Sequence, residues 1–149
     1  MDAIDKRILR QMQEDSRLSM ADLGDKVGLS ASACHRRIKA MEDSGVISGY
    51  VASLNAELMG QTMSFVLEVS LNSQSDEAMR AFESALELIP EILHCDLMTG
   101  GFDYVMRINA KDSRDFERIH ARVRGAPHVM TLETKMVLRN VKAWRGIRV

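Results

Sequence analysis

The sequence of 149 residues has only two cysteines, few aromatic residues and almost no net charge. Two cysteines cannot form the disulfide framework of a small secreted domain, so we expect Cys34 and Cys95 to be reduced core residues. No apolar run approaches the roughly 18 residues that span a bilayer, and the N-terminus lacks the apolar region of a secretory signal. We therefore expect a cytoplasmic protein with no membrane partner.

The lack of net charge limits the ways in which this chain can bind nucleic acid. Its 20 Lys and Arg face 21 Asp and Glu, and residues 1–50 hold eight of each sign. A protein that binds nucleic acid without sequence preference is usually more basic. DNA binding must therefore come from local charge, and residues 31–41 carry three cations and no anion.

Residues 30–42 predict an amphipathic helix. Cys34, Ile38 and Met41 follow the helical period and form one apolar stripe, and Ser30 is suited to cap the helix start. Another face carries small polar and cationic side chains. A cationic helix start after a tight turn is typical of a helix that reads the DNA major groove.

Two shorter helices precede this segment. One is predicted from Asp2 to about residue 13, and the other begins after Ser19, a capping residue, and ends near residue 26. Gly28 and Gly45 suit the left-handed turns on either side of the third helix. The pattern predicts a three-helix, helix-turn-helix domain, and the alternative is a small helical unit with a solvated cationic face.

Residues 46–54 are rich in β-branched side chains and predict an extended segment, which is either a wing or a connector. No strong pattern follows in residues 55–61. We therefore place the domain boundary between residues 61 and 62.

From residue 63 the hydrophobic period changes from that of a helix to that of a strand. Strands are predicted at 63–71, around 93–97, at 102–108 and from 129 to about 138. Helices are predicted from Ser75 to Pro90 and from Ser113 to Gly125, and Gly100-Gly101 predicts a two-residue hairpin turn. The order strand, helix, strand, strand, helix, strand is that of an α+β, ferredoxin-like domain over residues 62–149.

The expected sheet has one face that its own helices cannot cover. Two helices cover only one side of four strands, and alternation places Val66, Met98 and Val105 on the other side. Apolar residues there predict a partner sheet from a second copy of the chain. We therefore expect a homodimer.

Several short motifs occur in an order and spacing that resemble those of the Lrp/AsnC family, the feast/famine transcription regulators of bacteria and archaea. They are Ile4-Asp5 with Ile8-Leu9, Val27-Gly28-Leu29-Ser30, Cys34 with Arg37-Ile38, Gly45-Val46-Ile47-Ser48-Gly49-Tyr50, Thr99-Gly100 with Phe102-Asp103-Tyr104, and Val137-Leu138 near Val141-Lys142. The resemblance implies a winged helix-turn-helix, a hinge strand and an effector-binding βαββαβ domain. It also implies an amino-acid effector and dimers that assemble to octamers.

Candidate DNA contacts lie on the predicted third helix. Recognition helices read bases with residues near their N-terminus, while neighbouring residues bind phosphate. We assign base reading to Ser32, His35 and Arg36, and phosphate or structural contacts to Arg37 and Lys39, with Ser30 at the helix start. The resemblance implies that Arg37 positions the helix on the DNA backbone. The alternative for each side chain is a solvated surface position.

Candidate effector contacts lie in the stretch from Thr99 to Asp103. The glycines Gly100 and Gly101 expose backbone N–H groups to a carboxylate, and Asp103 offers a fixed negative charge to an amino group. The resemblance implies that this loop lines the effector pocket and that a threonine of the last strand, Thr134 or Thr131, contributes. The alternative is a plain hairpin turn with a solvated carboxylate.

The sequence motifs offer little support for a metal site, an enzyme active site or a nucleotide-binding site. The four histidines show no metal-ligand spacing, and we find no activated nucleophile, phosphate-binding loop or dinucleotide fingerprint. We therefore expect that the protein is not an enzyme and that it binds no cofactor or metal. The expected partners are double-stranded DNA and an amino acid. The alternative is a ligand-sensing ferredoxin-like module whose helix-turn-helix binds a protein, which the salt dependence of DNA affinity would distinguish.

Overall fold

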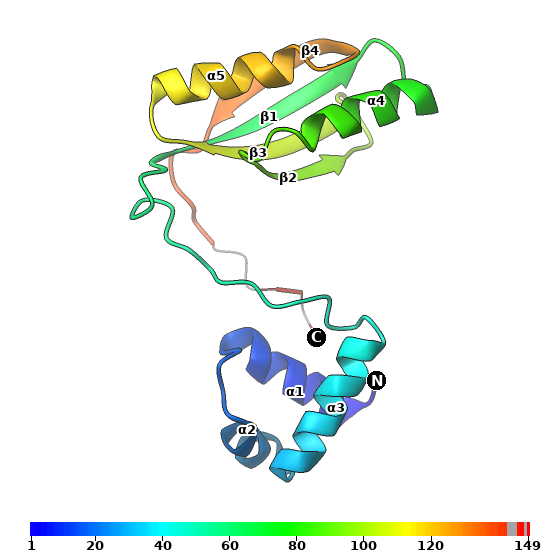
Figure 1. Ribbon diagram of the computed structural model, residues 1–149, viewed down its shortest axis with the longest axis vertical. Helices are drawn as coiled ribbons and strands as arrows, with labels where there is room; N and C mark the ends of the chain where they lie inside the picture. The colour runs from blue at the N-terminus through cyan, green and yellow to red at the C-terminus, as the bar shows by residue number, and fades with distance from the viewer. Residues whose placement is uncertain (143–145, 148) are drawn as a thin grey trace. The chain divides into compact units, whose positions relative to one another are not determined.

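The computed structural model describes residues 1–142, 146, 147 and 149 and divides into two compact units (Figure 1). We call Met1–Ser53 with Lys142–Val149 the helical unit and Leu54–Val141 the sheet unit. The division differs from the predicted boundary at 61 and 62, because residues 54–61 belong to the sheet unit and the segment from Lys142 to the helical unit.

The helical unit contains α1 (Ala3–Glu14), α2 (Met20–Val27) and α3 (Ala31–Asp43). The side chains of Asp2, Ser19 and Ser30 accept backbone N–H groups at the three helix starts, so the predicted caps are confirmed. The core consists of apolar residues at helical spacing from all three helices: Ile8, Leu23, Val27, Cys34, Ile38 and Met41.

The turn between α2 and α3 depends on two glycines. Gly28 has a φ of 73°, as expected for a left-handed helix end. Gly24 lies inside α2 and is buried, and its carbonyl accepts the Leu29 N–H at 2.9 Å. A Cβ at Gly24 would lie 2.4 Å from the Leu29 carbonyl oxygen. Only glycine therefore allows this close approach, which the sequence pattern did not reveal.

Residues 46–54 form a connector and contain no strand. Gly45, with a φ of 74°, ends α3 as predicted. The Tyr50 hydroxyl donates to Glu42 Oε1 at 2.9 Å, so the start of the connector is tied back to α3.

The sheet unit has the predicted βαββαβ order. Its strands are β1 (Met63–Leu71), β2 (Ile92–Leu97), β3 (Tyr104–Ala110) and β4 (Val129–Met136), and its helices are α4 (Asp76–Leu86) and α5 (Ser113–Arg124). The strands lie in the order β2-β3-β1-β4 and all neighbours are antiparallel. The predicted α+β, ferredoxin-like architecture is confirmed.

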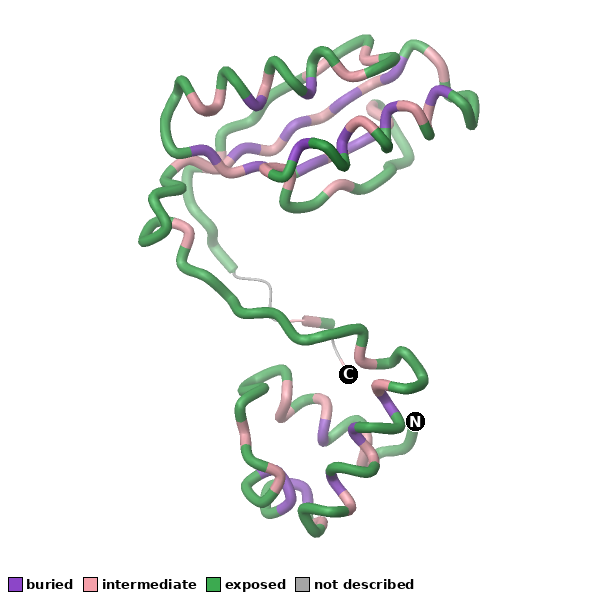
Figure 2. The backbone as a smooth tube through the Cα atoms, viewed as in Figure 1, coloured by how far each residue is buried: buried purple, intermediate pink, exposed green. Residues whose placement is uncertain are grey.

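Both helices cover the same face of the sheet, and the core lies between (Figures 1 and 2). Alternate residues of β1 and β3 are buried there, and the rings of Phe65 and Phe116 stack with centroids 4.1 Å apart.

Two details of the sheet unit differ from expectation. Helix α4 ends at Leu86, before Pro90, and residues 98–103 form a loop in place of a two-residue turn at Gly100-Gly101.

The other face, which we call the open face, is more polar than expected. Val66 and Val105 are half-buried on it, as alternation predicted, but Met98 lies in the loop after β2. Val66 pairs with Arg107 and Lys135, and Val105 pairs with Glu68 and Asp96. The two valines are therefore surrounded by charged residues on neighbouring strands.

In the part of the chain that the structure describes, no helix combines the length and the apolar composition needed to cross a membrane.

Candidate DNA- and ligand-binding sites

Helix α3 presents one exposed polar stripe, which we call the readout stripe: Ser32, His35, Arg36 and Lys39. Residues three and four apart share one face of a helix, and the core residues of α3 occupy another. The stripe begins in the first turn of the helix, directly after the α2–α3 turn. This is the position from which a recognition helix reaches base edges.

Arg36 and Lys39 differ in their surroundings. The Lys39 ammonium lies 2.9 Å from Asp43 Oδ1, an exposed pair one helical turn apart that raises the pKa of Lys39. Among the described residues, Arg36 takes part in no ion pair. Arg36 is therefore the cation of the stripe that is available to an outside partner.

Arg37 has a structural role inside the helical unit. Its Nη1 donates to Asp5 Oδ1 at 2.7 Å and to Asp2 Oδ2 at 2.8 Å, which raises the pKa of the guanidinium. The Asp5 backbone N–H and Arg37 together lower the pKa of Asp2 to about 2. Arg37 thus joins α3 to the start of α1, and of the two predicted roles the geometry favours the structural one.

Ser30 is also occupied within the chain. Its hydroxyl accepts the Ala33 N–H at 3.3 Å and lies 3.2 Å from the Ser32 hydroxyl. The Ser30 side chain therefore shapes the start of α3, while Ser32 remains exposed beside it.

The two units carry opposite net charges. Residues 1–53 hold eight cations and eight anions, and Lys142–Val149 adds three cations and no anion, so the helical unit has a net charge of +3. The sheet unit holds nine cations and thirteen anions, a net charge of −4. An anionic polymer such as DNA is attracted to the helical unit and repelled by the other.

The loop of residues 98–103, which we call the glycine loop, is open to solvent. Thr99, Gly100 and Gly101 are exposed, and a Cβ built on either glycine would meet no atom within 4 Å. Gly100 has a φ of 126°, which L side chains rarely adopt. The backbone there is therefore accessible, as a carboxylate-binding loop requires.

Asp103 is a hydrogen-bonded junction and not a solvated turn residue. Its Oδ2 accepts the Leu71 N–H and its Oδ1 accepts the Gln74 amide, both at 2.7 Å. Its own N–H donates to the Val69 carbonyl at 2.9 Å, and its carbonyl accepts the Met98 N–H at 2.7 Å. The half-buried carboxylate thus joins the start of β3 to the end of β1.

The two threonines of β4 lie on opposite faces of the sheet. Thr134 pairs with Leu67, whose side chain faces the helices, whereas Thr131 pairs with Ser70 on the open face. Thr131 is also nearer the end of β1 that Asp103 contacts. The register does not bring Thr134 to the glycine loop.

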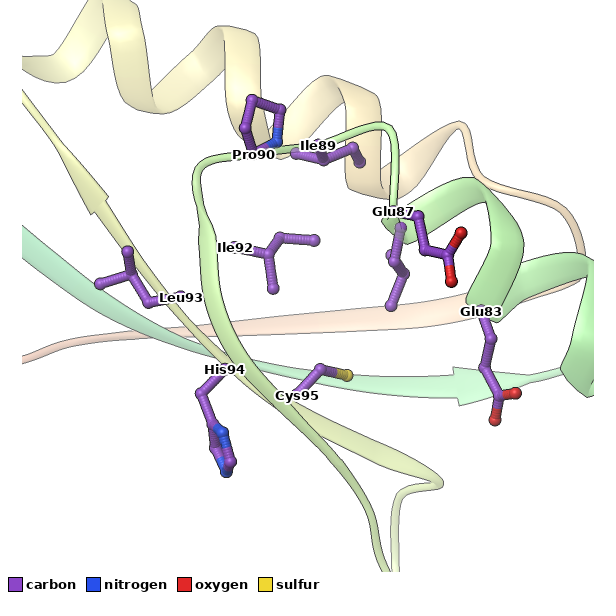
Figure 3. Close-up of a pocket in the computed structure, with 9 residues that line it drawn as sticks. Glu83, Glu87, Ile89, Pro90, Ile92, Leu93, His94 and Cys95 are labelled. Carbon is purple, nitrogen blue, oxygen red and sulfur yellow. The ribbon is translucent and has the colours of Figure 1, made fainter. Parts of the chain in front are cut away.

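A separate pocket of 420 Å³ lies between the end of α4 and β2 (Figure 3). None of the predicted ligand residues lines it. Cys95 lies in its wall, and burial, with smaller effects of Asp96 and Glu83, raises the pKa of its thiol to about 11. This thiol is therefore a poor nucleophile near neutral pH.

Both units match known protein families. Residues 1–48 match the family described as winged helix-turn-helix DNA-binding, and residues 64–147 match the Lrp/AsnC ligand binding domain. The chain belongs to the Lrp/AsnC family. The resemblance inferred from the sequence motifs is confirmed, and the protein is a transcriptional regulator with a DNA-binding domain and a ligand-binding domain.

Relatives extend over most of the chain. It is 42% identical over 121 residues to an HTH-type transcriptional regulator of Sinorhizobium fredii, covering 80% of this chain and 95% of the relative. It is 34% identical over 143 residues to the leucine-responsive regulatory protein of Haemophilus influenzae, covering 95% and 86%.

Solved structures show the same fold. A crystal structure of an AsnC family regulator from Agrobacterium tumefaciens superposes with a TM-score of 0.93 at 31% identity, covering 99% of this chain and 96% of that one. A regulator of Neisseria meningitidis in complex with L-methionine superposes with a TM-score of 0.89 at 30% identity, covering 96% and 93%.

Proposed function

We propose that this Lrp/AsnC regulator reads its DNA site through the readout stripe and changes its DNA binding or assembly when an amino acid binds at the glycine loop. The observation that supports DNA reading most directly is the contrast between Arg36, which has no ion-pair partner among the described residues, and Arg37, which has two. We propose a regulator and not an enzyme, acting in the cytoplasm with the DNA it binds.

Arg36 is the residue to test for base reading. An arginine that binds a guanine edge with two hydrogen bonds contributes about 1–3 kcal/mol of discrimination, about 5- to 150-fold in affinity. We expect Arg36→Ala to weaken binding to a site selected from a random DNA pool by such a factor, with a much smaller effect on scrambled DNA. Lys39→Ala should weaken both equally. An equal loss for both DNAs with Arg36→Ala would exclude base reading by this residue.

The salt dependence separates DNA from a protein partner. Each phosphate contact contributes about −0.9 to the slope of log affinity against log salt. A flat titration would instead favour the helix-turn-helix as a protein-binding surface.

The glycine loop is complementary to both ends of an amino acid. The exposed backbone at Thr99, Gly100 and Gly101 suits the carboxylate, and Asp103 suits the ammonium. The L-methionine complex of the Neisseria relative and the name of the leucine-responsive relative support this class of ligand. The resemblance left Thr134 and Thr131 open as the contact from the last strand, and the register of β4 makes Thr131 the better candidate.

A thermal-shift screen of the twenty amino acids tests the ligand class. A ligand at a hundred times its Kd stabilises the folded state by about 2.7 kcal/mol, which raises Tm by several degrees. Asp103→Asn should remove this shift while DNA binding remains, and the hit's analogue without the amino group should not bind wild type. A shift that survives both changes would contradict the assignment of Asp103.

We propose a homodimer through the open face, and the family resemblance supports further assembly to an octamer. Val66 and Val105 would form the centre of the contact, with charged residues around them. Val105→Lys tests this, because the new cation would lie between Glu68 and Asp96 and the single chain should still fold. Sedimentation should show monomers for this variant, and an unchanged assembly would refute the open-face contact.

A further inference from the structure

We propose that Gln74 is a positioning residue for Asp103 and thereby sets the affinity of the amino-acid site. The inference rests on the proposed function, because it assigns Asp103 to the ammonium group of the ligand. Gln74 lies 29 residues from Asp103 in the sequence, in the link between β1 and α4.

The geometry shows how the Asp103 carboxylate is held. The Leu71 N–H binds Oδ2 and the Gln74 side-chain amide binds Oδ1, each at 2.7 Å. Two donors on different oxygens restrict rotation of the carboxylate about its side-chain bonds. Among the described residues, Gln74 supplies the one side-chain hydrogen bond to Asp103, while Leu71, Val69 and Met98 contribute backbone groups.

The same arrangement leaves acceptor capacity for a ligand. A carboxylate offers about four lone-pair sites, and two are occupied here. An ammonium group can therefore bind Asp103 without displacing Gln74. A charge that is already oriented binds its partner without a further ordering cost, which is the basis of preorganisation.

Gln74 lies in a link, residues 72–75, that hydrogen bonds hold on both sides. The Ser75 hydroxyl caps α4 by accepting the Ala78 N–H at 3.3 Å, and the Ser73 hydroxyl lies 3.2 Å from it. On the other side, the Asn72 N–H donates to the His128 carbonyl at 2.9 Å. Because the backbone is fixed on both sides of Gln74, ordering its exposed side chain against Asp103 costs side-chain entropy but no further backbone entropy.

Two nearly isosteric variants separate positioning from direct contact. Gln74→Met keeps the length of the side chain and removes the amide donor. Gln74→Glu also removes the donor but adds a negative charge near the ligand's ammonium. If the donor matters, both variants should bind more weakly, by about three- to tenfold. If the Gln74 amide oxygen instead accepted directly from the ligand's ammonium group, Gln74→Glu should bind more tightly than wild type.

The measurement is a calorimetric titration of the full-length protein with L-leucine and L-methionine as probes. Gln61→Met is the matched control, because Gln61 is exposed in the same unit and contacts Asn109 at the other end of β3. The two Gln74 variants should unfold at a slightly lower denaturant midpoint, because each loses one exposed hydrogen bond, whereas DNA affinity should stay unchanged in all three variants. The expected result is weaker amino-acid binding for both Gln74 variants and unchanged binding for Gln61→Met.

Three outcomes would overturn the inference. Unchanged affinity in Gln74→Met would refute positioning while leaving the proposed function intact. Tighter binding by Gln74→Glu would assign the Gln74 amide oxygen a direct contact with the ammonium group instead. A wild-type protein that binds neither probe, nor any other amino acid in the thermal-shift screen, would refute the proposed function and the positioning role together.

Discussion

The two units of this protein enclose cores of very different size. Among the described residues, the core of the helical unit has six buried side chains and that of the sheet unit has thirteen. Besides its smaller core, the helical unit is stabilised by helix caps, by the close backbone approach at Gly24 and by the ion pairs of Arg37. The smaller core predicts a lower free energy of unfolding for the DNA-binding unit than for the ligand-binding unit.

The two candidate sites also differ in how many segments of the chain position their side chains. The readout stripe lies on a single helix, α3, and its exposed Arg36 has no ion-pair partner among the described residues. In the sheet unit, Asp103 already accepts two hydrogen bonds that connect a loop to a strand end. The proposed DNA contacts thus come from one helix, whereas the proposed ligand contact at Asp103 depends on several segments at once.

The largest expected effects come from matched core truncations, Ile8→Ala and Leu67→Ala. Both side chains are fully buried, and such changes cost about 2–5 kcal/mol. Because its free energy of unfolding is expected to be lower, the helical unit should unfold at ambient temperature in Ile8→Ala. The sheet unit of Leu67→Ala should stay folded with a lower Tm. Circular dichroism melts and hydrogen exchange of each unit measure this. Equal outcomes would mean that the two units share one cooperative transition.

Gly24→Ala should have the next largest effect, about 2 kcal/mol, because its Cβ would meet the Leu29 carbonyl oxygen at 2.4 Å. DNA affinity should fall as well, since α3 must move. Gly101→Ala in the sheet unit is the control, with open space around its Cβ and an expected change near zero. Urea unfolding and a DNA titration measure both, and similar results for the two glycines would contradict the close approach.

A smaller change, about 0.5 kcal/mol, is expected for Tyr50→Phe, which removes the exposed hydrogen bond to Glu42. The sheet unit should be unaffected. Protease cleavage in residues 46–54 should become faster, because the connector is released from α3. Unchanged cleavage would show that the hydrogen bond does not restrain the connector.

The smallest effect concerns pH. The folded pKa of Asp2 is lowered to about 2, first by the Asp5 N–H and then by Arg37, from an ordinary value near 3.9. Its contribution to stability is therefore fully present above about pH 4 and is lost as the pH falls towards 2. Asp2→Asn should flatten this part of the curve for the helical unit, measured as urea midpoints between pH 5 and pH 2.

Much of the fold could be predicted because the signals are local. Helix caps at Asp2, Ser19 and Ser30, the left-handed glycines Gly28 and Gly45, and the alternation along β1 each involve residues within a few positions of one another. The order of the elements then restricts the second unit to very few topologies.

The site details could not be predicted in the same way. Arg37 was assigned to phosphate or structure, and only the fold shows that its carboxylate partners are Asp2 and Asp5, more than 30 residues away. The glycine loop was expected to be a two-residue turn, but the Met98 N–H donates to the Asp103 carbonyl and closes a longer loop, which the Asp103 carboxylate ties to Leu71 at the end of β1. These contacts join segments that are distant in the chain, and no periodicity encodes them.

The sequence by itself determined the elements, their caps, the order βαββαβ and the cationic face of α3, because hydrophobic period and turn chemistry act over a few residues. The tertiary structure alone decided that Gly24 must lack a side chain, that Arg37 is occupied while Arg36 is available, and that Gln74 holds Asp103. Each of these depends on a distance between separate segments, which exists only after the chain has packed.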